Sequence, residues 1–547
     1  MKKKLNVGIL IDDVIINLWE YNILKKIVDS ESAEIKLVIQ DGTTHIGKND
    51  EKYPVFYRFH DKLDRYLFKH KFNYDNSIDI SDFIRELPVI TFDSKNGDAF
   101  TSRIEQDLDV VLNLGVLEPG SGISENSQYG IWSYRIGHTG KVRDQFAGYW
   151  ETMKNLPMIE GAIFMLSSDG QETEIYGTNA PTYPESIHQV RDRIYAAAAV
   201  VIPRMLKGLF ENGGVYLENL ISNLSREDDL GHPGLFKPPS SSEAFSNLFT
   251  LAKTKIERIF NPDLWFLLIG KQPDDDFPFN LNPEKFIKIS PPAGVFWADP
   301  FILYRDNKYY LFIEEYVYQT NKGHISVLEL DSEGVLLSSE IIIKQPYHMS
   351  YPFIFEWDNE YYMIPETMQN KTIGLYRCKK FPNEWEFVLN LMEDVTAVDS
   401  TLFFHEQKWW LFTSIDETGT FEKPFNELFL FFTDDLFSGQ WKSHPGNPII
   451  TDLRASRPAG KIVQYNNKIY RPSQDCSERY GRAMKISQIT KMTENKYEET
   501  LVKEIEPTWH KGLLATHTIN FDSPAVILDA CERARRLRFN LFKKKIN

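Results

Sequence analysis

The sequence predicts a chain of two fold classes, an α/β domain followed by an all-β five-bladed propeller. Strand and helix patterns alternate over the first part, as expected of a mostly parallel sheet covered by helices. The second half contains five near-repeats spaced 48 to 60 residues apart, which is the period of four-stranded propeller blades. A polar segment separates the halves, and a length of 547 residues exceeds what one hydrophobic core usually supports.

The α/β domain is predicted from the spacing of apolar residues. LNVGILI, IKLVIQD and DLDVVLNLG are typical of buried strands, and NLWEYNILKKIVDS has the periodicity of an amphipathic helix. The segment from Glu185 to Leu209 is predicted to be a long helix that closes the domain. No GxGxxG follows the first strand, so the dinucleotide-binding fingerprint is absent.

The domain boundary is predicted near residues 225–245, where SREDDLGHPGLFKPPSSSEAFSNLF combines charges, Gly, Pro and a Ser triplet. A helix from about Ser242 to Ile259 and the strand WFLLIGKQ follow, and this strand is expected to complete the last blade. The predicted parts are an α/β domain (1–224), a linker with a connecting helix (225–260), a propeller (261–530) and a basic tail (531–547).

Each of the five repeats places a polar residue at the start of an innermost strand. The signatures begin WADPF, SYPFIF, VDSTLFF, SRPAG and THTINF, and in the first three a polar turn joins two β-rich runs, as in a hairpin. Innermost strands converge on a propeller axis, so we expect the equivalent residues to meet there: Asp299, Tyr351, Asp399, Arg457 and His517. The alternative is that they are ordinary turn and strand-start residues.

Composition excludes some function classes. A net charge of -15 argues against a nucleic-acid-binding surface, and an aromatic content of 14% fits a sheet-rich protein that contacts sugars. Cys378, Cys476 and Cys531 match no metal-binding spacing, and no metal site is predicted; three separated cysteines indicate a reducing compartment.

The two ends of the sequence bear on location. MKKKLNVGILIDD is predicted to be a first strand and not a signal peptide, and no stretch approaches the roughly 18 apolar residues of a membrane-spanning helix. We therefore expect a cytoplasmic protein. The tail CERARRLRFNLFKKKIN is basic and amphipathic, so it either rests on the inner face of a membrane or forms a solvated terminal helix.

The run from Asp109 to about Thr182 resembles the formyltransferase fold, a Rossmann-like domain that moves a formyl group from formyltetrahydrofolate to an amine. The resemblance lies in VVLNLG, YGIWSYRIG, AGYWETM and IEGAIFML. It implies an Asn, a His and an Asp in the site, and these positions are occupied here by Ser133, Arg135 and Glu172. Formyltetrahydrofolate is expected as a cofactor only if this domain is active.

Arg135 is a departure that puts formyl transfer in doubt, because a guanidinium does not act as a base near neutral pH. His138 could supply the base if its loop folds back. Two alternatives remain: Arg135 and His138 belong to an anion site with Lys141 and Arg143, or the loop is an ordinary basic surface.

The second half resembles the N-terminal propeller region of glucosamine inositolphosphorylceramide transferases, within the five-bladed superfamily of arabinanase-like and fructosidase-like glycoside hydrolases. The motifs, in order, are FWADPF, HMSYPF with IPE, LYRC with FPNEW, HPGNPI, SRPAG, YRPSQDCSERYG and THT. This resemblance implies a propeller that works in a sugar-transfer system.

The resemblance to the hydrolases implies a set of carboxylates that this chain has only in part. Asp299 matches their blade-one base, their second aspartate falls near Tyr351, and their acidic Glu falls near Asp399. Glu366 is the remaining candidate acid. The rest of the predicted site is rich in donors suited to phosphate or carboxylate groups: His348, Tyr351, Arg457, Arg471, Gln474, Asp475, His517 and Thr518. The alternative for these residues is a set of structural salt bridges.

The sequence thus leaves several functions open. The first is a carbohydrate-active transferase of cell-surface glycan or glycolipid synthesis that binds a nucleotide-activated or phosphate-bearing sugar in the propeller. The second is an amino-sugar N-formyltransferase that uses the first domain. The others are a glycan-binding scaffold and, with an incomplete set of carboxylates, a glycoside hydrolase.

Overall fold

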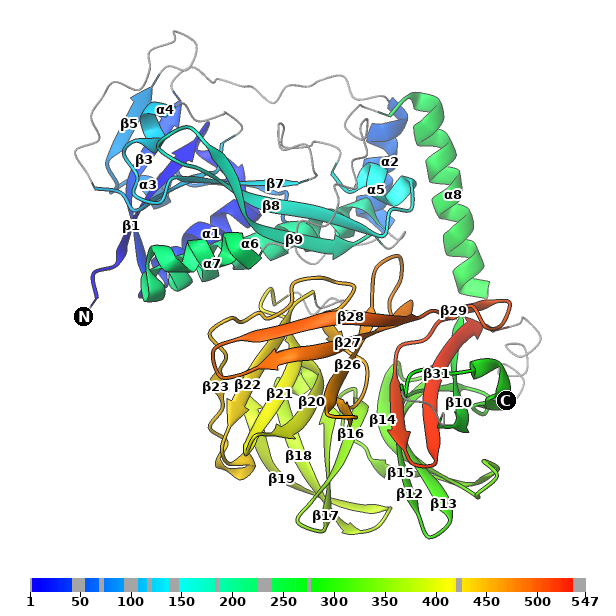
Figure 1. Cartoon of the computed structure of the whole chain (residues 1–547). Helices are drawn as coiled ribbons and strands as arrows, with labels where there is room; N and C mark the ends of the chain where they lie inside the picture. The colour runs from blue at the N-terminus through cyan, green and yellow to red at the C-terminus, as the bar shows by residue number, and fades with distance from the viewer. Residues whose placement is uncertain are drawn as a thin grey trace. The chain divides into compact units, whose positions relative to one another are not determined.

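The structure is a computed structural model of the whole chain (Figure 1). It describes residues 2–41, 55–67, 73–92, 107–115, 121–136, 147–182, 186–223, 239–260, 262–272, 277–419 and 426–534. Two compact units, Met1–Ala252 and Lys253–Asn547, divide the chain, and the finer four-part division stays a prediction. Among the described residues, no helix combines the length and apolar character needed to cross a membrane. The basic tail from residue 535 on lies outside the described residues.

Unit 1 is built on a seven-stranded mixed sheet in the order β5-β3-β1-β6-β7-β8-β9. The strands from β5 to β7 are parallel, and β8 and β9 are added antiparallel. This sheet confirms the α/β class. Its strands are β1 Leu5–Ile11, β3 Ala33–Asp41, β5 Val89–Phe92, β6 Val110–Asn113, β7 Ile131–Ile136, β8 Met158–Leu166 and β9 Glu172–Pro181; β2 Ile15–Asn17 and β4 Ser77–Asp79 form a separate pair.

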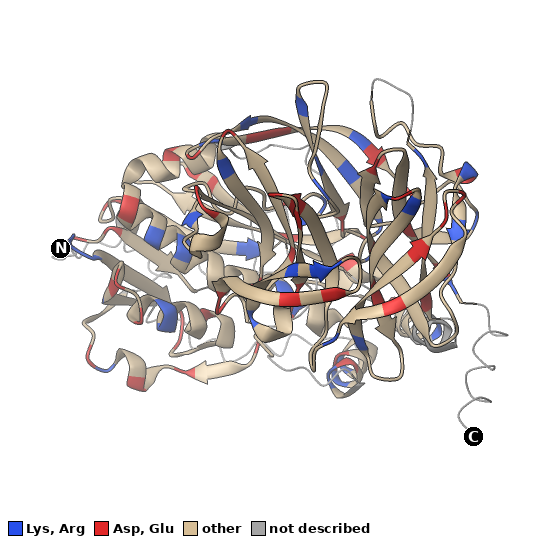
Figure 2. Ribbon diagram, turned by 90° about the horizontal axis from the view of Figure 1, so that it is seen from below, with Lys and Arg blue, Asp and Glu red and all other residues tan. Residues whose placement is uncertain are grey.

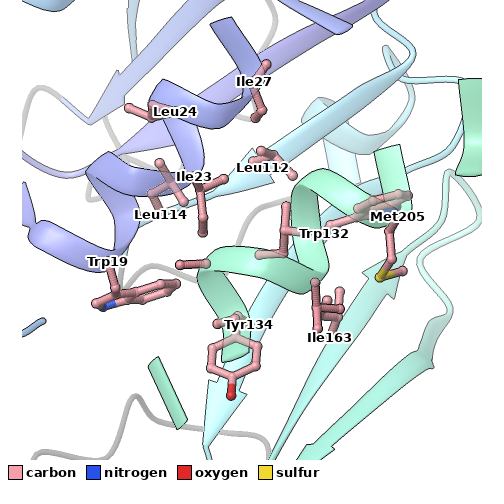
Figure 3. Packing of buried hydrophobic residues seen from close by; sticks show 14 of the residues in the cluster. Trp19, Ile23, Leu24, Ile27, Leu112, Leu114, Trp132, Tyr134, Ile163 and Met205 are labelled. Atoms are coloured by element: carbon pink, nitrogen blue, oxygen red, sulfur yellow. The ribbon is translucent and has the colours of Figure 1, made fainter. Parts of the chain in front are cut away.

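Helices α1, α6 and α7 pack on this sheet with their apolar residues. Helix α1 buries Trp19, Ile23 and Ile27 on one side, and Figure 3 shows them beside Trp132 of β7 and Met205 of α6. Helix α6 is the long helix that the sequence predicts. The helices are α1 Leu18–Val28, α2 Val55–Leu67, α3 Ser81–Ile84, α4 Ser121–Ser124, α5 Tyr149–Met153, α6 Ile187–Asn212, α7 Gly214–Asn223 and α8 Ser241–Phe260.

Unit 2 is a five-bladed β-propeller, as predicted, and contact between neighbouring innermost strands joins the blades. Three short 3-10 helices lie at Pro283–Lys285, Met368–Asn370 and Leu436–Ser438. Blade 1 contains β12 Val295–Arg305, β13 Lys308–Val317, β14 Lys322–Leu330 and β15 Leu336–Ile343. Blade 2 contains β16 Ser350–Trp357, β17 Glu360–Glu366, β18 Thr372–Lys380 and β19 Glu384–Glu393. Blade 3 contains β20 Ala397–His405, β21 Lys408–Ile415, β22 Leu428–Thr433 and β23 Lys442–Ser443. Blade 4 contains β24 Arg457–Pro458, β25 Val463–Tyr465, β26 Lys468–Asp475, β27 Ala483–Met492 and β28 Tyr497–Ile505.

Blade 5 closes the ring with strands from both ends of the unit. It contains β29 Leu513–Ala515, β30 Ile519–Asp522, β31 Ala525–Arg533, β10 Asp263–Lys271 and β11 Ile287–Ile289. Strand β10 pairs antiparallel with β31 along its whole length. This pairing confirms that the WFLLIG strand completes the last blade.

The hairpin turns of the first three blades also agree with the sequence. In blade 1 the turn residues Asp306 and Asn307 both have positive φ, of 53° and 61°. Asp358 and Asn359 in blade 2 repeat this conformation, which is that of a type I′ turn. Two such residues in succession match the right-handed twist of the strands, so they fix the register of β12 with β13 and of β16 with β17.

Candidate functional site

The innermost strands of blades 1, 2 and 3 carry the same backbone kink at the predicted signature residue. Asp299, Tyr351 and Asp399 have φ values of 51°, 42° and 52°, and the strand register shifts at each of them. A non-glycine residue in this region costs about 1 to 2 kcal/mol. Because the kink takes the residue out of the strand ladder, the amide of Tyr351 is able to donate to Asp299 Oδ2 at 3.3 Å. The repeated signature residue therefore marks a bend in the backbone of the innermost strand and not only the start of that strand.

One half of the axis cluster is centred on Asp299 and His517. The hydroxyl of Thr518 donates to Asp299 Oδ1 at 2.8 Å, and His517 Nε2 lies 3.8 Å from the same oxygen. On the other side of the imidazole, Asp529 Oδ2 lies 2.6 Å from His517 Nδ1. Asp299, His517 and Asp529 each offer a ligand atom within 4.8 Å of the others, so they could also hold a divalent cation.

The other half is centred on Arg457. Its Nε donates to Asp399 Oδ2 at 2.5 Å, and one guanidinium nitrogen lies 3.8 Å from Glu366. Gln474 Nε2 donates to the same Asp399 oxygen at 3.0 Å, and the hydroxyl of Ser350 donates to Glu366 at 3.0 Å. Asp399 Oδ1 is buried and has no hydrogen-bond partner among the described residues. A buried carboxylate oxygen without a donor is costly, so this atom marks where an added hydroxyl or amine would be stabilised.

Two aromatic side chains cover these groups. The Trp265 ring stacks on the His517 ring with centroids 4.1 Å apart, and the Tyr480 ring lies 4.9 Å from the Arg457 guanidinium carbon. Tyr480 also meets the His517 ring edge-on at 5.5 Å. The relative exposure of Asp299, Asp399 and Arg457 is only 4%, 1% and 1%. The polar groups at the axis are therefore buried.

Burial and neighbouring charges set the protonation of the axis groups. Burial raises the pKa of Asp299, and the carboxylates of Asp399 and Asp529 add to this while His517 opposes it. Burial also raises the pKa of Asp399, against the attraction of Arg457. Burial disfavours the charged form of His517, yet Asp529 and Asp299 outweigh it and raise the pKa of this imidazole. Asp299, Asp399 and His517 thus hold their protons more tightly than the same groups do in water.

We expect Asp299→Asn to gain stability relative to the wild type as the pH rises. Because the folded pKa is raised, stability from the protonated Asp299 is fully present below the ordinary carboxyl pKa, near pH 4, and is lost as the pH rises through the folded pKa. Asn cannot ionise, so the free energy of unfolding of the variant minus that of the wild type should increase by about 1.4 kcal/mol per unit of raised pKa. Chemical denaturation of the full chain between about pH 4 and pH 8 measures this difference. A difference that falls with rising pH would show that the folded pKa is lowered.

Not every predicted site residue joins the axis cluster. Arg471 forms a forked pair with Glu499 on β28, at 2.7 and 2.8 Å. Asp475 pairs with Arg482 at 3.0 Å. His348 accepts a hydrogen bond from the Gly323 amide and lies 3.5 Å from Glu314. The structure brings together the others: Asp299, Tyr351, Glu366, Asp399, Arg457, Gln474, His517 and Thr518.

Three members of the cluster were not predicted from the sequence: Trp265, Tyr480 and Asp529. Asp529 had a usable signal, because it is the one acidic residue in the apolar run AVILDAC, where a buried strand residue needs a polar partner. Trp265 and Tyr480 had no such signal, since aromatic residues are frequent throughout this half.

In unit 1 the predicted formyltransferase positions form a salt bridge. Arg135 of β7 donates two hydrogen bonds to Glu172 of β9, at 2.9 and 2.5 Å, and its guanidinium lies over the Phe164 ring. Ser133 accepts a hydrogen bond from the Asn113 side chain at 3.3 Å. His138 lies outside the described residues. A paired guanidinium and carboxylate do not fit folate-dependent formyl transfer, because neither is free to accept the amine proton.

The propeller matches a known family over most of its length. Residues 287–519 match the model of the N-terminal region of glucosamine inositolphosphorylceramide transferase 1. The matched segment is less than half of the chain, but it contains all five signature residues.

Individual relatives agree with this match. Glucosamine inositolphosphorylceramide transferase 1 of Oryza sativa subsp. japonica is 36% identical over 210 residues, which are 38% of this chain and 28% of that protein. The protein of the same name from Arabidopsis thaliana is 32% identical over 38% of this chain and 27% of its own length. The match therefore spans little more than a quarter of the length of these curated relatives.

Solved structures with some similarity are propeller glycosidases. The catalytic domain of an α-L-arabinofuranosidase from Coprinopsis cinerea has a TM-score of 0.33 at 10% identity and covers 43% of this chain and 90% of that one. An exo-1,5-α-L-arabinanase from a bovine ruminal metagenomic library has a TM-score of 0.30 at 14% identity, over 44% of this chain and 98% of that one. Scores this low have no bearing on the activity of this chain.

Proposed function

We propose that this chain is a carbohydrate-active transferase of glycolipid or cell-surface glycan synthesis, and that the propeller axis binds its sugar substrate. The relatives that match the propeller are named glucosamine inositolphosphorylceramide transferase 1. Residues of the axis cluster from Asp299 to Thr518 all fall inside the matched segment. The cytoplasmic location predicted from the sequence belongs to the same proposal.

The unpartnered Asp399 oxygen is the observation that carries the ligand site. Carboxylates accept hydrogen bonds from sugar hydroxyls, and Asp399 Oδ1 is a buried acceptor to which no described residue donates. The raised pKa of Asp299 lets that side chain act as a donor as well. A sugar hydroxyl that bridges these two side chains would satisfy both.

The charges favour the sugar part of a substrate over its phosphate. The three predicted anion binders are already paired with carboxylates: Arg457 with Asp399, Arg471 with Glu499 and His517 with Asp529. A phosphate at the axis would therefore have to displace a buried carboxylate, which is unfavourable. In a nucleotide-activated or phosphate-bearing sugar, we propose that the sugar ring enters the axis and that the phosphate stays outside it.

Entry of a sugar requires the axis to open. Trp265 and Tyr480 cover His517 and Arg457, so we propose that Tyr480 moves aside when a ligand binds. Ordinary glycoside hydrolysis is less favoured, because the set of carboxylates is incomplete: Tyr351 occupies the position of the second aspartate of the hydrolases, and Asp399 is paired with Arg457.

For unit 1 we propose a formyltransferase-type Rossmann-like domain that has lost the formyl-transfer reaction. The proposal is supported by the mixed sheet and by the Arg135–Glu172 pair at the positions of the catalytic His and Asp. Its role would then be structural or in substrate recognition. Stabilisation of the chain by formyltetrahydrofolate would revive the second candidate function, amino-sugar N-formylation.

We expect sugars or nucleotide sugars of the correct class to raise the melting temperature of the full chain, because a ligand that binds only the folded state stabilises it. Glu366→Gln should abolish the shift, since it removes a charge that Arg457 and Ser350 position at the axis. Glu499→Gln is the matched control, because it alters a buried Arg pair that lies outside the axis cluster, and should leave the shift unchanged. No shift with any member of a broad panel, or an equal loss in both variants, would contradict an axis site.

A further inference from the structure

Helix α2 and the part of α8 that belongs to unit 1, up to Ala252, share an exposed aromatic surface, which we call the α2/α8 face. Its exposed apolar residues are Val55, Phe56, Phe59 and Tyr66 of α2, with Phe245 and Phe249 of α8, and their exposure ranges from 44% to 76%. The rings of Phe56 and Phe245 meet edge-on with centroids 6.0 Å apart. This contact links the exposed residues of the two helices, so they are grouped and not scattered singly as is normal on soluble proteins.

The opposite sides of the two helices are firmly packed. Tyr57 of α2 and Ala244 of α8 are buried in one cluster with Tyr149. The Asn247 side chain donates to the hydroxyl of Tyr149 at 3.0 Å, and Figure 1 shows α2, α5 and α8 next to one another. The buried sides therefore hold the two helices in place, and Phe59 and Phe249 stay 54% and 67% exposed.

The charges on α2 are sorted by side. Arg58 and Lys62 are exposed, and neither makes an ion pair with any residue that the structure describes. The acidic residues of the helix face inward, where Asp61 meets His188 at 2.8 Å and Asp64 accepts a hydrogen bond from Ser186 at 2.8 Å. The chain has a net charge of -15, and Figure 2 shows Asp and Glu along many of its elements. The outward side of α2 differs from this acidic balance, because Arg58 and Lys62 on it are both basic.

We propose that the α2/α8 face docks on an anionic lipid bilayer surface. Phe rings would enter the boundary between headgroups and acyl chains, and Arg58 and Lys62 would reach the lipid phosphates and carboxylates, as in interfacial amphipathic helices. A second copy of the chain is a poorer occupant, because in a two-fold dimer through this face the Arg58 and Lys62 side chains of both copies would lie in the same interface. The inference rests on unit 1 alone and is independent of the proposed sugar site.

Flotation of the full chain with lipid vesicles tests the proposal. We expect binding to vesicles of phosphatidylcholine with phosphatidylserine and little binding to phosphatidylcholine alone. Replacing Phe59 and Phe249 together by Ser should abolish binding, and R58E with K62E should weaken it by at least about tenfold. The matched control replaces Val335 and Leu337 by Ser, because these residues of blade 1 are equally exposed, at 58% and 52%, and should not matter.

Three results would overturn the proposal. In the first, the wild-type chain binds neither kind of vesicle. In the second, binding survives the α2/α8 substitutions and disappears on deletion of residues 535–547. In the third, the same substitutions would abolish self-association in sedimentation while vesicle binding remained, which would identify a second copy as the occupant. Melting temperatures equal to that of the wild type show that the variants are folded, and R58Q with K62Q repeats the charge test without introducing negative charge.

Discussion

Arg457→Met is expected to lower the free energy of unfolding of the propeller by about 3 to 5 kcal/mol. The guanidinium is 1% exposed and lies 2.5 Å from Asp399 and 3.8 Å from Glu366. Met fills a similar volume, but it leaves two buried carboxylates without their counter-charge. Chemical denaturation of the full chain, followed through propeller tryptophans such as Trp265, measures the loss.

The effect should be coupled to Asp399. In the Arg457→Met background, Asp399→Asn removes one of the two uncompensated charges, so part of the lost stability should return, with a coupling free energy of about 1 to 3 kcal/mol. Arg377→Met is the control, because it breaks an exposed pair with Glu386 and should change stability little. Additive effects of the Arg457 and Asp399 substitutions would show that the pair is not held together in solution.

Asp529→Ala is expected to cost at least about 4 kcal/mol, since each buried donor left without an acceptor costs about 1 to 3 kcal/mol. Asp529 is fully buried and accepts hydrogen bonds from the backbone amides of Asp299, His517 and Thr518, at 3.1, 2.9 and 3.1 Å. It also holds the His517 ring. The loss should appear in chemical denaturation as a lower midpoint for unit 2.

A matched control comes from an exposed turn. The Asp331 side chain also accepts two backbone amides, from Glu333 and Val335, each at 2.9 Å. Water can replace that carboxylate, so Asp331→Ala should cost much less than Asp529→Ala. An equal cost per lost amide hydrogen bond would contradict the role of burial, because Asp529 accepts three amides in a buried site and Asp331 accepts two in a turn that water reaches.

The architecture of unit 2 was predictable because its repeats combine two independent patterns. Two-residue turns such as Asp306 and Asn307 fix the hairpins. The polar signature residue on the strand before the turn, such as Asp299, marks the innermost strand of the blade. The strand Asp263–Lys271 could be assigned to the last blade because propellers often close their ring with a strand from the other end of the unit. Sequence periodicity thus determined the fold of this unit well.

The candidate site was only partly predictable. Gln474 and Arg471 lie on the same strand, β26, but at different distances from the axis. Gln474 reaches Asp399, whereas Arg471 lies farther along the strand and pairs with Glu499. Sequence proximity does not reveal that difference. The pairing of Arg457 with Asp399, 58 residues away, depends on how adjacent blades pack. The sequence therefore identified the polar residues without showing that they neutralise one another.

Hydrogen–deuterium exchange with and without the sugar that most stabilises the chain tests the axis site most directly. We predict that bound sugar slows exchange in residues 476–482, which include Tyr480, and in residues 516–518, which contain the axis residues His517 and Thr518. Protection should be absent in Glu366→Gln and retained in Glu499→Gln. Protection confined to unit 1, or to the outer strands of the blades, would contradict a carbohydrate site on the propeller axis.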